Sequence, residues 1–294
     1  MIRSKSWRDR LGYALIIAVL LVLTFVCLYP ILYILAVSLS SKAAAEAGMV
    51  KLWPVDFNLS SYVKILQDQK FGSSFLISVE RVILGSGLQF VLTLLTAFGL
   101  SRSTRQFRQR NVYMWFLVFT MLFNGGLVPT YVTIKNYGLI DSIWALVLPG
   151  ALPVFNVILL MNFFRNIPKE MDEVSRLDGC GPWRMMLSIY LPLAMPAIAT
   201  VTLFSVVGQW NSFFDGLIYM NRTENYPLAT YIQTLVVQPT LTSMSASERI
   251  ELAHVSNKTL NAAKIFVSLV PILAIYPFFQ RYLVHGIMLG SVKE

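Results

Sequence analysis

Long stretches without a single charged side chain dominate this sequence of 294 residues. The stretches lie between Arg10 and Lys42, Arg81 and Arg102, Arg110 and Lys135, Asp141 and Arg165, from about Leu193 to Asp215, and between Lys264 and Arg281. About 20 residues of helix, rising 1.5 Å each, cross the roughly 30 Å hydrocarbon core of a bilayer. Five stretches reach that length, and the sixth has only sixteen uncharged positions, 265–280. The chain is therefore predicted to be an all-α integral membrane protein with six transmembrane helices.

The composition agrees with lipid as the solvent of this chain. Only 13% of its residues are charged, 56% are hydrophobic and the mean hydropathy is +0.62, whereas soluble domains carry about 25% charged residues. The apolar run that begins at Leu11 stays uncharged to Ser41, far beyond the length of the apolar region of a signal peptide. We therefore expect the first stretch to be a retained transmembrane helix.

Lysine and arginine counts predict the orientation, because cytoplasmic loops of membrane proteins carry an excess of both. If the N-terminus is cytoplasmic, the inside segments hold 14 basic residues in 53 positions and the outside segments hold 10 in 90. The inside segments are 1–10, 102–110, 165–184 and 281–294, and the outside segments are 42–81, 135–141 and 222–264. Both termini are therefore predicted to be inside. The net charge of +9 is accordingly a topology signal, and nucleic-acid binding is not expected.

The sequence contains no cluster of metal-ligating or nucleophilic side chains. Cys27 and Cys180 have no metal spacing and form no disulfide framework, and His254 and His285 are isolated. We therefore expect this chain to bind no metal or cofactor and to catalyse no reaction.

Two outside segments, 42–71 and 221–261, are long enough to bind a partner. Loops of this length are uncommon without a binding role or internal structure, although a mobile loop is the alternative. Helix breakers also occur at membrane depth, at Gly125-Gly126 and at Pro149 with Pro153. The backbone groups that they free must be satisfied by neighbours or face a watery cavity, which is compatible with a transport path.

The predicted cytoplasmic segment 165–192 encodes a helix, a tight turn and a second helix. Asn166 is the expected N-cap, and acidic residues fill the first turn, where the helix dipole favours them. Met171, Val174 and Leu177 recur every three residues, so one face of this helix is apolar. Gly179 is expected to adopt the left-handed conformation that ends a helix.

The second helix is expected to begin at Pro182 and to end before Pro192. Its predicted apolar stripe consists of Trp183, Met186, Leu187 and Tyr190. The first helix has to bury its apolar face against lipid headgroups or in a groove of a partner protein. Its acidic first turn disfavours an anionic lipid surface, so a protein groove is favoured.

This segment resembles the EAA loop of binding-protein-dependent ABC importer permeases. The pattern of that loop is E-A-A, three residues, G, nine residues, I, one residue, L-P. Its matches here, with every spacing kept, are Glu173, Gly179, Ile189, Leu191 and Pro192. Val174 and Ser175 replace the two alanines, and both still fit a packed helix.

The resemblance covers essentially the whole chain and is strongest from Phe71 to Gly290. Further matches to the carbohydrate-type permeases are Tyr29-Pro30 with Ser38, residues 97–101, residues 121–129 and Trp210-Asn211. The chain is similar to the second permease of maltose, arabinan-oligosaccharide and alginate importers. This implies a tail, first helix and outer loop over 1–71, an importer transmembrane domain over 72–284, and a cytoplasmic tail over 285–294.

The resemblance implies a permease subunit of an ATP-driven, binding-protein-dependent importer of sugars or oligosaccharides, anionic ones included, in the inner membrane of a bacterium. The residues implied in coupling to the ATPase are Met171, Glu173, Val174, Leu177, Asp178 and Gly179. The implied partners are a second homologous permease, two ATP-binding subunits, an extracytoplasmic solute-binding protein, the saccharide and membrane lipid. No G-x-x-x-x-G-K-[S/T] motif occurs in the chain, so ATP and Mg²⁺ are expected on the partner subunits.

The predicted substrate path contains Trp210, Asn211, Asp215 and Asn124. Sugars are held by amide hydrogen bonds and aromatic faces, and an ionisable group at membrane depth is a functional candidate because its burial is costly. The alternatives are that Trp210 is an interfacial anchor and that Asp215 reaches interfacial water. Glu80 and Arg81 lie at the outer mouth of the second helix, where contact with the binding protein is one interpretation and an ordinary interfacial charge pair is the favoured one.

Three other functions compete with the importer hypothesis. A secondary transporter or channel explains the breakers equally well, but it does not need the loop from Glu173 to Pro192 and usually buries several ionisable residues. An intramembrane enzyme would need His/Asp or Ser/His clusters, which the spans lack. A non-transporting scaffold is the third alternative.

Overall fold

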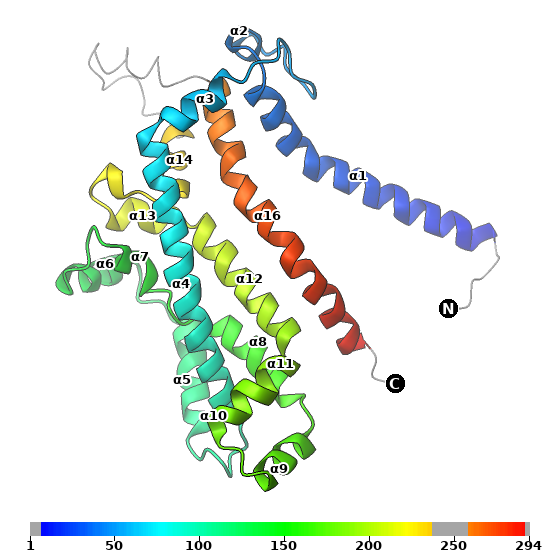
Figure 1. The fold of residues 1–294 in the computed structure, drawn as a ribbon, viewed down its shortest axis with the longest axis vertical. Coiled ribbons are helices and arrows are strands. Elements are labelled where there is room, and N and C mark those ends of the chain that lie inside the picture. Colours follow the sequence, from blue (N-terminus) through cyan, green and yellow to red (C-terminus); the bar gives the residue numbers. More distant parts are fainter. Residues whose placement is uncertain (1–6, 237–257, 292–294) are drawn as a thin grey trace. The chain divides into compact units, whose positions relative to one another are not determined.

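The computed structural model describes residues 7–236 and 258–291, and all regular structure within them is helical (Figure 1). The chain divides into two compact units, residues 1–71 with 234–270 and residues 72–233 with 271–294. Parts of three predicted regions lie outside the described residues: 1–6 of the N-terminal tail, 237–257 of the outer segment 221–261, and 292–294 of the C-terminal tail.

The first unit contains α1 (Trp7–Ser38), α2 (Lys42–Glu46), α3 (Ser60–Gln67) and the N-terminal part of α16 (Lys258–Ser291). Its small apolar core consists of Ala36, Val37, Ala44, Ala45, Val50 and Ala262. The side chain of Lys264 is buried, and its Nζ lies 2.6 Å from Oδ2 of Asp68. Ser61 donates to Oγ1 of Thr259 at 3.1 Å, which adds a second polar link between α3 and α16.

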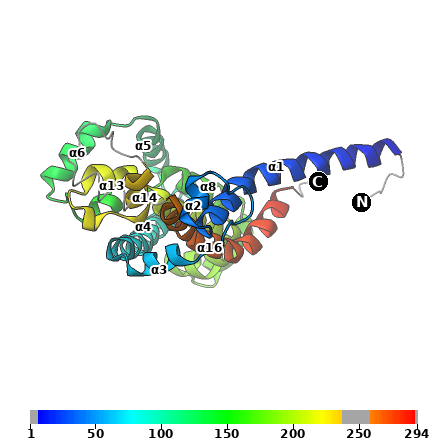
Figure 2. The same ribbon diagram turned by 90° about the horizontal axis from the view of Figure 1, so that it is seen from above.

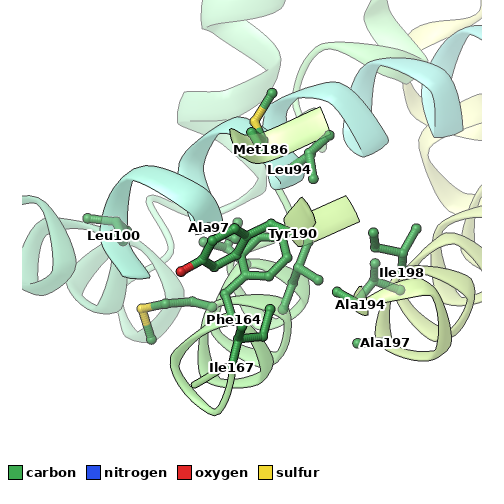
Figure 3. Packing of buried hydrophobic residues seen from close by; sticks show 14 of the residues in the cluster. Leu94, Ala97, Leu100, Phe164, Ile167, Met186, Tyr190, Ala194, Ala197 and Ile198 are labelled. Carbon is green, nitrogen blue, oxygen red and sulfur yellow. The ribbon is translucent and has the colours of Figure 1, made fainter. Parts of the chain in front are cut away.

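The second unit contains most of the chain, including nearly all of α4 (Gln69–Ser101). Its other helices are α5 (Arg110–Leu122), α6 (Leu127–Asn136), α7 (Ile143–Val147), α8 (Val154–Arg165), α9 (Lys169–Leu177), α10 (Pro182–Met185), a π-helical turn (Met186–Tyr190), α11 (Leu191–Leu193), α12 (Met195–Asn211), α13 (Phe214–Tyr219), a 3₁₀ turn (Thr223–Asn225), the first part of α14 (Leu228–Val236) and the C-terminal part of α16. The core lies where α4, α8, the π-helical turn and α12 meet (Figure 3). Phe98, Phe164 and Tyr190 stack edge to face at its centre.

Three helices are long and apolar enough to cross a membrane: Arg10–Ser38, Gln69–Ser101 and Lys258–Gln280. They correspond to the first, second and sixth predicted stretches. The sixth is longer than the sixteen residues 265–280, because Lys264 lies within the helix, where Asp68 compensates its charge. The same helix continues to Ser291, so most of the predicted tail 285–294 is helical.

The third, fourth and fifth stretches are broken where the sequence places Gly and Pro. Gly126 has φ +91°, and α5 and α6 form an angle of 111°. The fourth stretch is divided into the short α7 and the 12 residues of α8 by a break that ends at Pro153. Residues 182–193 and α12 form an angle of 86°. By length and composition, three helices of the described residues can span a membrane, or five if each bent pair is one span.

Helices α6, α7 and α13 pack together through Ile134, Leu146 and Tyr219. Figure 1 shows α6 beside α7, and α13 lies close to α6 in both views (Figures 1 and 2). Asp141 fixes the chain before α7 by accepting hydrogen bonds from the backbone N–H groups of Asn221 and Arg222. Burial by itself raises the pKa of the Asp141 carboxyl. Hydrogen bonds from Asn225, Arg222 and Asn221 outweigh burial and lower this pKa below its ordinary value.

Candidate functional site

Helix α9 presents an apolar face that no described residue covers. Met171 is 41% exposed, Val174 58% and Leu177 87%, and these are the three residues whose spacing predicted one apolar face. Glu173 and Asp178 are exposed beside them. The face therefore has both the apolar surface and the acidic rim that a partner protein can recognise.

The glycine turn after α9 is confirmed. Gly179 has φ +71°, and the N–H of Cys180 donates to the carbonyl oxygen of Ser175 at 2.9 Å. This six-to-one hydrogen bond closes a Schellman motif, which requires a left-handed residue in this place. The predicted N-cap is wrong, because Asn166 ends α8 with φ −81° and ψ −10° instead of starting α9.

The opposite face of α9 is held by a polar cluster that the sequence did not reveal. Oδ2 of Asp172 lies 2.8 Å from Nη1 of Arg102, and the Tyr190 hydroxyl donates to the same carboxylate. The guanidinium of Arg102 lies over the rings of Phe98 and Tyr190, each at 4.3 Å from the ring centroid. Two cation–π contacts and an ion pair thus fix α9 to the end of α4 and to the π-helical turn.

The second helix of the segment begins at Pro182 as predicted, but it does not end before Pro192. The N–H of Leu191 bonds to the carbonyl oxygen of Met186, five residues back, so the chain forms a π-helical turn and then α11. This wider turn precedes the proline, whose ring would clash with a carbonyl in a regular helix. The predicted stripe is split, since Met186 and Tyr190 are buried while Trp183 and Leu187 are exposed.

A cavity of about 410 Å³ lies among α4, α7, α8, α12 and the start of α13. Five of its lining side chains carry amide or charged groups: Arg81, Gln89, Asn156, Gln209 and Asp215. All except Asp215 are more than nine-tenths buried. Helices with a mostly apolar surface have thus placed their few polar side chains together.

An ion pair between Arg81 and Asp215 forms one wall of the cavity. Both oxygens of Asp215 accept from the guanidinium, and Oδ1 also accepts from Oγ of Ser212 and from the N–H of Gly216. Nε of Arg81 donates to Oε1 of Gln209 at 3.0 Å. The interpretation of Arg81 as an ordinary interfacial charge is therefore wrong, because its side chain is only 3% exposed and it binds groups 128 and 134 residues away.

Comparison with known proteins identifies the family of the chain. Residues 89–289 match the family "Binding-protein-dependent transport system inner membrane component". The chain belongs to this family. It is 36% identical over 286 residues to the polygalacturonan/rhamnogalacturonan transport system permease protein YtcP of Bacillus subtilis, covering 97% of this chain and 99% of YtcP.

Two further relatives agree with this assignment. The diacetylchitobiose uptake system permease protein NgcG of Streptomyces coelicolor is 26% identical, with coverage of 99% of this permease and 92% of NgcG. A chain in the crystal structure of a bacterial ABC transporter involved in the import of the acidic polysaccharide alginate has a TM-score of 0.85 and 30% identity. That match covers 95% of the permease and 99% of the other chain. The permease is thus an inner-membrane transport protein, and its family is one of transport subunits.

The predicted path residues of the permease do not share one site. Asp215 lines the cavity. Trp210 is buried elsewhere, with its ring edge to face with Phe75 at 5.7 Å. Asn211 is exposed at the end of α12, and Asn124 is exposed in the break before α6, where its Oδ1 accepts from the N–H of Gly126 at 2.9 Å.

Three amides of the cavity, Gln89, Asn156 and Gln209, were not singled out from the sequence. Each is an isolated polar residue within an apolar helix, and this was the available signal. A single amide in a span is compatible with many packing roles, so the sequence could not distinguish these three from other polar residues. Only their convergence in space does so.

Proposed function

We propose that this permease forms half of the translocation path of an ATP-driven, binding-protein-dependent importer of oligosaccharides. In this proposal the chain has six spans, with α8 and the bent pairs each counted as one, and both termini in the cytoplasm. The excess of basic residues in the inside segments supports this orientation. The second half of the path is a homologous permease subunit.

The observation that carries the proposal is the apolar face of α9. An exposed stripe of Met171, Val174 and Leu177 is unfavourable in water, so a groove on another protein is its natural environment. The inner face is meanwhile fixed through Asp172 to Arg102, so a force on α9 reaches α4 and the turn before α12. We infer that α9 docks on an ATP-binding subunit, which holds ATP and Mg²⁺ and supplies the energy for switching the cavity.

The names of the relatives support a saccharide substrate. They include a polygalacturonan/rhamnogalacturonan permease, a diacetylchitobiose permease and an alginate importer. The alginate importer takes up an acidic polysaccharide, so an acidic oligosaccharide fits the proposal as well as a neutral one. The family description supports delivery of this substrate by an extracytoplasmic binding protein.

Replacement of Leu177 by Asp tests the docking of α9. Leu177 is 87% exposed, so the substitution leaves the fold of the permease intact and places a charge in the proposed interface. We expect Leu177→Asp to stay in the membrane at the normal amount and to lose co-purification of the ATP-binding subunits and ATP-dependent uptake in proteoliposomes. The matched control is Leu66→Asp in α3, on the predicted outer side, where Leu66 is 88% exposed.

Equal recovery of the ATP-binding subunits with Leu177→Asp and Leu66→Asp would contradict docking through α9. Uptake by the purified permease alone, without ATP, would instead support the secondary-transporter alternative. Labelling of α9 by a membrane-impermeant reagent added only outside intact cells would contradict the proposed orientation.

A further inference from the structure

Three amide side chains reach the cavity of the permease from three different helices. They are Gln89 of α4, Asn156 of α8 and Gln209 of α12, which are 8%, 5% and 6% exposed. An amide has a donor end and an acceptor end, and burial of either end without a partner is unfavourable. Each amide therefore needs partners at both ends from the protein, from water or from a ligand.

The protein satisfies one end of each amide and fixes which end it is. Nε of Arg81 can only donate, so Gln209 directs its oxygen to it at 3.0 Å. Carbonyl oxygens can only accept, so Gln89 directs its NH₂ group to Gly150 at 2.8 Å, and Asn156 directs its NH₂ group to Val201 at 3.3 Å. These partners settle the two possible orientations of each amide.

The opposite ends of the three amides are free of hydrogen bonds to any described residue. They are the NH₂ group of Gln209 and the side-chain oxygens of Gln89 and Asn156. Some side-chain atoms of the described residues are buried from solvent and have no hydrogen-bond partner, but the free ends of these three amides are not among them. The free ends are therefore accessible to solvent, on three side chains that line the cavity, and they offer one donor group and two acceptors.

The ion pair of the cavity leaves little capacity for an anion. Arg81 makes four hydrogen bonds, one from Nε to Gln209 and three from its other nitrogens to Asp215 and the carbonyl oxygen of Ser212. A guanidinium engaged in this way cannot bind another carboxylate with two parallel hydrogen bonds. Asp215 repels an incoming carboxylate as well. The cavity thus favours neutral groups that both donate and accept, which hydroxyl groups do.

We propose that Gln89, Asn156 and Gln209 form a binding site for the hydroxyl groups of a saccharide ring in the translocation path. One hydroxyl accepts from Gln209 and donates to Gln89 or Asn156, while carboxylates of an acidic saccharide are bound elsewhere. The cavity of about 410 Å³ lies within the usual range of roughly 300–1,000 Å³ for ligand sites. Phe204 and Tyr219 line it as well and offer aromatic surface. This inference rests on the proposed function and names the substrate groups that the path contacts.

The substitution Gln209→Glu tests this site, because Glu keeps an oxygen for Arg81 and replaces the donor that faces the cavity by an acceptor. The complete importer, with its partner permease, ATP-binding subunits and binding protein, is reconstituted and tested with arabinooligosaccharides and oligogalacturonides. We expect the maximal uptake rate divided by KM to fall about 10-fold for every probe that the wild type imports. The amount of assembled complex stays normal. The control Gln109→Glu lies at an exposed position whose side chain makes no capping bond, and it has no effect.

A second variant, Gln89→Met, removes an acceptor from another helix and covers the case in which Gln209→Glu reduces assembly. The site is overturned, and the proposed function stands, if all three variants take up the probes at the wild-type rate. These variants are Gln209→Glu, Gln89→Met and Gln109→Glu. A loss confined to oligogalacturonides would overturn it too, because it would place a carboxylate beside residue 209. If the wild-type importer takes up no oligosaccharide, the proposed function fails and the site fails with it.

Discussion

Helix α9 and the cavity differ in the side chains that they leave without a protein partner, which are apolar on α9 and polar in the cavity. Helix α9 directs apolar side chains outward and keeps Asp172 and Ser175 on its inner side, where Asp172 meets Arg102. The cavity gathers polar side chains such as Gln209 inside helices that are otherwise apolar. We propose that a second molecule covers each of them: a protein groove for the apolar face of α9, and a hydroxylated ligand for the free amide ends.

The comparison shows two ways in which a membrane protein prepares a binding surface. The apolar surface of α9 is local, since residues on successive turns of one helix form it. A single cluster around Arg102 holds this helix in place. The surface of the cavity is assembled from residues far apart in the chain and depends on the Arg81–Asp215 pair. Substitutions in the two anchors should therefore differ in the size and in the reach of their effects.

The largest effect is expected for Asp215→Asn. It leaves the guanidinium of Arg81, which is only 3% exposed, without a compensating charge, and removal of one partner of a buried ion pair costs about 3 kcal/mol. Unfolding of the purified permease in detergent should shift to a clearly lower temperature, whereas Glu80→Gln, at the exposed neighbour of Arg81, should leave it unchanged. The double substitution Arg81→Met with Asp215→Leu should recover most of the loss. Equal midpoints for the two single variants would contradict a structural role of the pair.

A smaller and local effect is expected for Arg102→Lys. Lysine keeps the charge but loses the planar group that stacks on Phe98 and Tyr190, at a cost of about 1 kcal/mol. Backbone amides of 169–177 should exchange hydrogen faster, and uptake per ATP hydrolysed should fall, while exchange in α12 stays the same. The control is Arg105→Lys, at an exposed position of the same loop. Identical exchange in the two variants would show that Arg102 does not hold α9.

The smallest effect is expected for Gly179→Ala. The added Cβ meets no atom within 4 Å, so the cost comes only from the left-handed backbone and amounts to about 1 kcal/mol, confined to the end of α9. Gly99→Ala in α4 also meets no atom, but lies in regular helix, so it should be neutral or slightly stabilising. Thermal unfolding and hydrogen exchange measure both. A stabilised Gly179→Ala variant would contradict the Schellman turn.

Some features of this fold follow from local sequence and were predicted for that reason. The long apolar runs predicted the helices α1, α4 and α16, and the spacing of Met171, Val174 and Leu177 predicted the exposed stripe of α9. Gly179 predicted the end of that helix. Two predicted helix ends were wrong. Asn166 caps the C-terminus of α8 instead of starting α9, and the helix continues past Pro192 because a π-helical turn precedes the proline.

The sequence by itself determined that this chain is helical, that its long apolar segments belong in lipid, and where α9 presents its apolar face. These properties depend on neighbours within one or two helical turns. Only the tertiary structure decided which polar residues meet, because Arg81 and Asp215 are separated by 134 residues and Gln89 and Gln209 lie on different helices. A charge or amide is costly inside an apolar bundle until a distant partner compensates it, so packing and not periodicity selects the residues of the cavity.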